Sequence, residues 1–144
     1  MSPSKRLQPV QRVAHSKEQK AARHMGESHK TLQEEQTKLA QLRQYHQEYL
    51  QRFDTAAKKG IGVNQLQEYR AFLSKLDTAI RQQEGIVATR KVDHNSKKNN
   101  WKETHTRSQA LKNVVDRYQK QERKAADHNE QKESDDRGQR SNKN

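Results

Sequence analysis

Histidine is the residue type in this sequence best suited to ligate a metal ion or to transfer a proton. A metal site on a helix needs two such ligands one turn apart, supported by a carboxylate. No pair of the seven histidines has this i, i+4 spacing, so we predict neither a metal site nor a cofactor. The histidines are His15, His24, His29, His46, His94, His105 and His128.

Other catalytic patterns are also missing from the sequence. Gly60-Ile61-Gly62 lacks the strand–loop–helix context and the Lys-Ser pair of a phosphate-binding loop. The chain contains no cysteine, which excludes disulfides and thiolate chemistry and is compatible with a cytoplasmic setting. A pair of helices offers no concave, water-excluding pocket for a reaction. We therefore predict that the protein is not an enzyme.

The apolar residues recur with the spacing of a coiled coil on both sides of these glycines. Steps of three and four alternate, which keeps one stripe, the a/d seam, facing a partner helix. Folding at the turn pairs residues whose numbers add up to 122, so that Phe53 meets Tyr69 and Ser28 meets His94. His46 lies on the seam, and we interpret it as a partly buried core histidine. The seam is Leu39, Leu42, His46, Tyr49, Phe53 and Ala56 before the turn, and Leu66, Tyr69, Leu73, Leu76 and Ile80 after it.

The sequence therefore predicts an all-α fold, a long antiparallel two-helix coiled-coil hairpin. We expect a flexible arm over 1–8, a first helix over about 9–58, and a turn over 59–63 with Asn64 as N-cap. The second helix should cover about 64–125 or beyond, and the polar tail 126–144 should be frayed or disordered. We expect the hairpin to be tightest near the turn and loosest around Met25–Leu32 and Arg90–Lys97, where the seam becomes polar.

Composition and charge support this interpretation. Only 28% of the 144 residues are hydrophobic, enough for a seam but few for a globular core. We see no signal-peptide pattern and no apolar run long enough to cross a membrane. Of the net charge of +12, residues 1–30 carry 7 basic against 2 acidic side chains, and residues 90–125 carry 11 against 4. This excess gathers at the open end of the hairpin, where it would attract an acidic partner, an anionic membrane or nucleic acid.

Apolar residues outside the seam indicate a docking surface. Tyr45, Phe72 and Ala79 fall at g positions, and the two g rows of an antiparallel pair lie on the same flank. Exposed aromatic side chains are favoured as anchors of protein interfaces. The alternative is that these rings only widen the hairpin's own core, but a two-stranded coiled coil cannot cover a g-position ring fully.

The sequence resembles the FliJ family of bacterial flagellar export proteins. The resemblance is carried by QYHQEY at 44–49, KGIG at 59–62 and YRAFLSKLDTAI at 69–80. It extends back to KEQKAARHMGE at 17–27 and forward to Trp101 and the charged C-terminal tail.

The resemblance implies a non-catalytic protein of the type III flagellar export machine, similar in fold to the rotor stalk of rotary ATP synthases. As partners it implies the hexameric export ATPase, the cytoplasmic domain of the export-gate protein and empty export chaperones. As location it implies the cytoplasm, with peripheral association to the inner membrane at the flagellar base. The gate-binding residues that it implies are Lys38, Leu42, Tyr45, Tyr49, Phe72, Leu76, Ala79 and Gln83. The basic open end would enter the ATPase ring, with Arg12, Lys17, Arg107, Lys112 and Arg117 as candidate contacts.

Two other functions remain open from the sequence. The basic open end could bind nucleic acid or an anionic surface, although only Trp101 and Tyr118 are available there for base stacking and both occupy seam positions. The chain could also be a structural coiled coil that associates with itself.

Overall fold

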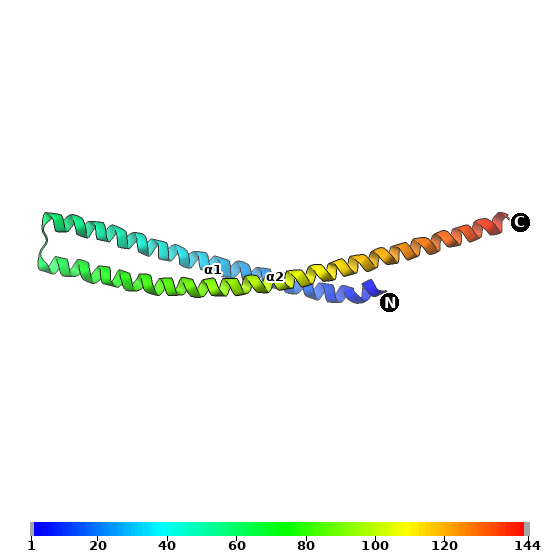
Figure 1. Ribbon diagram of the computed structural model, residues 1–144, viewed down its shortest axis with the longest axis horizontal. Coiled ribbons are helices and arrows are strands. Elements are labelled where there is room, and N and C mark those ends of the chain that lie inside the picture. The colour runs from blue at the N-terminus through cyan, green and yellow to red at the C-terminus, as the bar shows by residue number, and fades with distance from the viewer. Residues whose placement is uncertain (1, 143–144) are drawn as a thin grey trace. The chain divides into compact units, whose positions relative to one another are not determined.

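The computed structural model describes residues 2–142, and within this range the chain is two helices, α1 (Pro3–Lys59) and α2 (Val63–Asn142), with no strand. The helices run in opposite directions from a short connection (Figure 1). The predicted all-α antiparallel hairpin is thus confirmed. The chain forms two compact units: unit 2 is Arg23–Asn99, which contains the turn, and unit 1 pairs the described residues up to Ala22 with those from Asn100 onward.

The turn depends on a glycine with a left-handed backbone. Gly60 has φ = 88°, and its N–H donates to the Ala57 carbonyl at 3.2 Å, which caps the C-terminus of α1. The Leu66 N–H donates to the Gly62 carbonyl at 3.0 Å, so Gly62 occupies the N-cap position of α2. The N-cap predicted at Asn64 is therefore wrong by two residues, and Asn64 lies inside the helix.

We expect Gly60→Ala to lower the free energy of unfolding by about 1 kcal/mol, because only glycine adopts positive φ without steric cost. Gly85→Ala is the control: Gly85 lies inside α2, its φ is not in the left-handed region, and an added Cβ would meet open space at both positions, so alanine should not destabilise the protein there. Thermal unfolding followed by circular dichroism compares the two variants. Equal melting temperatures would contradict this account of the turn.

From Pro3 onward the segment predicted to be a flexible arm is helical, and residue 1 of that segment lies outside the described residues. Ser2 caps it: the Ser2 carbonyl accepts from the Arg6 N–H at 3.1 Å, and its Oγ accepts from the Lys5 N–H at 3.4 Å. Ser4, which is buried, donates from its N–H and its Oγ to the two carboxylate oxygens of Glu122 on α2, at 3.1 and 2.6 Å. These bonds explain why α1 begins at Pro3 and not near Pro9, since either proline suits a first helical turn.

The C-terminal segment also differs from the expectation. α2 continues to Asn142 through the stretch predicted to be frayed or disordered (Figure 1). Residues 123–142 are all exposed. No proline interrupts it, and Glu133 and Arg137 form an i, i+4 ion pair at 3.5 Å. Residues 143 and 144 of the predicted tail lie outside the described residues.

In unit 2 the seam is buried most deeply away from the turn. Leu32, Leu39 and Val87 form a buried cluster with Ile80 packed against it. Nearer the turn, the aromatic seam residues are only half-buried, because rings of this size protrude from a two-stranded seam. Leu32 is thus buried although it lies in a segment where we expect the hairpin to be loosest. How tightly each segment is held stays a prediction, which hydrogen exchange would measure. Where the seven-residue repeat continues beyond Ile80, Gln83 and Val87 are buried, whereas Arg90 at the next position is exposed.

Small side chains make up much of the seam in unit 1. Ala14 and Ala21 on α1, and Ser108 and Val115 on α2, are all less than 9% exposed. Small residues let two helix backbones approach closely, so this pairing needs few large apolar side chains. The two helices of unit 1 can therefore pack closely together although the sequence of this unit is mostly polar.

Candidate functional site

Three aromatic rings meet on one flank of unit 2. The ring centroid of Phe72 lies 4.2 Å from that of Tyr49 and 6.1 Å from that of Tyr45, and the two tyrosines are 6.4 Å apart. Tyr45 is 49% exposed, which is a large exposed area for an aromatic side chain with two ring neighbours. The structure thus brings together aromatic residues from both helices. We call Leu42, Tyr45, Tyr49, Phe72 and Ala79 the aromatic flank.

The seam register explains this placement. Tyr49 is a seam residue, and its ring also packs on Tyr69 at a centroid distance of 5.5 Å. Tyr45 and Phe72 lie one position before a seam residue, so their rings lean over the edge of the seam and leave one side uncovered. Leu42 and Ala79 are half-buried beside them.

The remaining predicted gate-binding residues differ in exposure. Leu76 and Gln83 are buried, with only 7% and 9% of their surface exposed, so they offer a partner little surface. Gln83 Nε2 donates to the backbone oxygen of Glu35 at 3.0 Å and also to the Glu35 carboxylate, which lowers the pKa of that carboxyl. Lys38 is exposed, with its Nζ 3.5 Å from the Glu35 carboxylate.

A contact between a histidine and an aspartate connects the helices next to the aromatic flank. His46 Nε2 lies 2.9 Å from Asp77 Oδ1, and the histidine side chain is 27% exposed. The interpretation of His46 as a partly buried core residue agrees with this position. Its imidazole holds α1 to α2 in the segment that carries Tyr45 and Tyr49.

Ile86 is a further exposed apolar residue on α2 that the sequence reasoning missed. It is 42% exposed and follows Phe72 and Ala79 at intervals of seven residues, so it continues their g row. The same register that identified Phe72 could have identified it. It extends the apolar surface away from the turn.

The predicted basic contacts belong to unit 1 and are all exposed. The two helical segments that face each other in this unit, residues 2–22 and 100–125, together carry 12 basic and 4 acidic side chains. Trp101 stacks on His105 at a centroid distance of 5.0 Å, and both Trp101 and Tyr118 are half-buried. The basic residues are Arg12, Lys17, Arg107, Lys112 and Arg117.

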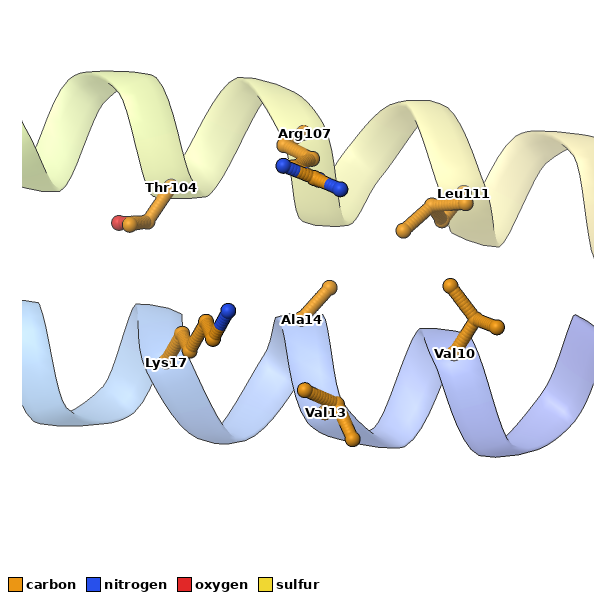
Figure 2. Close-up of a pocket in the computed structure, with 7 residues that line it drawn as sticks. All are labelled: Val10, Val13, Ala14, Lys17, Thr104, Arg107 and Leu111. Carbon is orange, nitrogen blue, oxygen red and sulfur yellow. The ribbon is translucent and has the colours of Figure 1, made fainter.

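Two of these cations border a small pocket between the helices of unit 1. Lys17 extends from α1 and Arg107 from α2, while Val10 and Leu111 point toward each other across the space between the helices (Figure 2). The pocket has a volume of about 70 Å³. The complete lining is Val10, Val13, Ala14, Lys17, Thr104, Arg107 and Leu111.

A carboxylate ties the helices together near this pocket. Glu18 Oε1 lies 3.1 Å from His105 Nδ1, and this hydrogen bond lowers the pKa of the Glu18 carboxyl from its usual 4.5. The ionised form therefore stabilises the folded state above pH 4.5, and this stabilisation is lost as the pH falls through the lowered pKa.

We expect Glu18→Gln to melt at a lower temperature than the wild type at pH 7, with the difference closing as the pH falls below about 4. Thermal unfolding of the variant and the wild type at a series of pH values measures this difference in melting temperature. Glu103→Gln, at an exposed position of the same unit, is the control and should shift the melting temperature little. If the difference in melting temperature between Glu18→Gln and the wild type stayed constant from pH 7 to below pH 4, the stabilising role of the ionised Glu18 carboxylate would be wrong.

The described residues contain no group of three or more histidine, cysteine, aspartate or glutamate side chains placed to hold a metal ion. No helix within residues 2–142 has a stretch both long and apolar enough to cross a membrane. The exposed features that remain as candidate sites are the aromatic flank and the basic surface.

Comparison with known proteins identifies the family. The family model described as flagellar FliJ protein matches residues 3–144, which is nearly the whole chain. No curated protein and no solved structure matches the chain. The match covers both helices and the turn that carries the aromatic flank. The chain therefore belongs to the FliJ family and is a component of the flagellar protein export apparatus.

Proposed function

We propose that this chain is a non-catalytic link between the export ATPase ring and the cytoplasmic domain of the export gate, and that it also handles empty export chaperones. The observation that carries the proposal is the aromatic flank, an apolar surface built from both helices and left uncovered by the hairpin itself. It lies in the half of the hairpin near the turn, where charge is nearly balanced, since residues 31–89 carry 8 basic and 7 acidic side chains.

The aromatic flank is the gate-binding surface in this proposal. Tyr45 presents half of its surface to solvent, while Tyr49 and Phe72 hold its ring in place. A ring that is already fixed loses little conformational entropy on binding, which favours it as an anchor. Ile86 and Lys38 lie at the margins of the same surface, so we include both among the residues that contact the gate.

The basic surface of unit 1 is the part that enters the ATPase ring. Its excess of eight positive charges over residues 2–22 and 100–125 would steer it toward an acidic partner and suits contacts that are polar and exchange readily. We place the protein in the cytoplasm, at the inner membrane of the flagellar base, because both proposed partners meet there.

The proposal is tested by a pull-down with the purified export ATPase and the purified cytoplasmic domain of the export gate, each against the full chain. We expect both proteins to be retained, and export chaperones to be retained when they are free of cargo. If the folded chain retained neither protein but bound DNA in a manner that weakened steeply with salt, the nucleic-acid alternative would replace this proposal.

A further inference from the structure

We infer that the pocket between Val10 and Leu111 is a docking site for an amphipathic, acidic helix of another export component. The site is separate from the aromatic flank, but it shares Lys17 and Arg107 with the basic surface proposed to meet the ATPase. The inference therefore rests on the chain's place in the export apparatus and deepens that part of the proposed function, while its test covers every cytoplasmic component and does not depend on which one binds. Figure 2 shows the residues that line it, contributed by both helices of unit 1.

The floor of the pocket is apolar and accessible. Val10 is 45% exposed and Val13 is 55% exposed, although neither occupies a seam position that the hairpin needs. Ala14, which is only 6% exposed, and Leu111, which is half-buried, also line the pocket. A site of this size accepts one aliphatic side chain, and burying two valines beneath it favours binding.

The charge at the rim determines the chemistry of the occupant. Lys17 and Arg107 lie on opposite helices and both line the pocket, and unit 1 around them is strongly basic. A carboxylate on either side of the inserted aliphatic residue would meet one cation on each helix. The occupant is therefore a segment with an aliphatic residue flanked by aspartate or glutamate.

The shape of the site favours a helical occupant. The pocket lies in the groove between two helices, whose backbone hydrogen bonds are satisfied internally, so they offer no edge to an extended peptide. A third helix can lie in this groove with its aliphatic residues one turn apart, and its carboxylates then fall at i±3 or i±4. This is the helix-in-groove mode of recognition.

The test uses an array of 20-residue peptides that tile the cytoplasmic components of the flagellar export apparatus, probed with the labelled full chain. We expect the bound peptides to combine aliphatic and acidic residues at helical spacing. For the strongest peptide, Val10→Asn/Val13→Asn should weaken binding at least about tenfold, as expected for the loss of apolar burial. Lys17→Glu should weaken it similarly.

Matched variants separate the pocket from general attraction. Val92→Asn removes a valine of unit 2 that is even more exposed, at 71%, and Lys20→Glu reverses an exposed charge of unit 1 outside the pocket. Both variants should bind the peptide as the wild type does. The inference would be overturned if no peptide bound, or if Val10→Asn/Val13→Asn bound the peptides as strongly as the wild type does. It would also be overturned by a wild-type dimer, seen by light scattering, that this double variant converts to a monomer, because the surface would then join two copies.

Discussion

The variant Tyr45→Ala/Phe72→Ala is expected to lose binding to the cytoplasmic domain of the export gate while it still stimulates the export ATPase. Aromatic anchors contribute roughly 2 kcal/mol or more each to an interface, so loss of both should weaken binding by about 1000-fold. Calorimetry measures binding of the variant to the gate domain, and an ATPase assay run in parallel measures its stimulation of the export ATPase. Both residues belong to unit 2, whereas the cations proposed to meet the ATPase belong to unit 1.

Phe72 also packs on Tyr49, so its removal will cost some stability of the hairpin. Helicity of the variant is therefore checked by circular dichroism, and the single variant Tyr45→Ala provides a milder test, because that ring is 49% exposed. Leu50→Ala is the matched control: Leu50 is 41% exposed on α1 but lies at an e position, on the other flank. A folded double variant that lost both activities together would contradict the division of roles.

The heptad register could be predicted from the sequence in detail. The pairing rule brought Ser28 opposite His94, and the structure places Ser28 Oγ 3.1 Å from His94 Nδ1. It also brought Phe53 opposite Tyr69, whose ring centroids are 5.5 Å apart. A coiled coil is predictable in this way because one uninterrupted seven-residue repeat fixes the face of every residue in both helices.

The ends of the helices were not predictable in the same way. Ser4 and Glu122 are separated by 118 residues, and their hydrogen bonds fix the N-terminal turn of α1 without any apolar pattern that would reveal it. Residues 123–142 lack a facing helix, so periodicity carries no information about them. The turn was predicted to within a few residues, since Gly60 is marked by its type, but the N-cap was not, because a glycine provides it with no side chain.

The candidate site was predictable in part. The g row identified Tyr45, Phe72 and Ala79, and the structure confirms that the first two are neighbours. The buried state of Gln83 follows instead from its hydrogen bonds to Glu35, a polar contact across the seam that apolar patterning cannot foresee.

The complementary variant reverses charge in unit 1, with Arg107, Lys112 and Arg117 each replaced by glutamate. All three side chains are exposed, so the net charge of the unit falls by six without loss of buried contacts. We expect stimulation of the export ATPase to fall at least about tenfold, because attraction between charged surfaces becomes repulsion, and gate binding to stay unchanged. Stimulation by the wild type should also weaken as salt screens the interaction.

The matched control places the same charge change in unit 2, at Arg70, Lys75 and Arg81, which are also exposed. If this control reduced ATPase stimulation as strongly, the effect would depend on net charge alone, and the assignment of the ring-binding surface to unit 1 would be wrong. If only the unit 1 variant lost stimulation, the two surfaces would act separately. An excess of positive charge on one unit and an uncovered aromatic surface on the other would then account for how a chain with little more than one apolar seam binds two different machines.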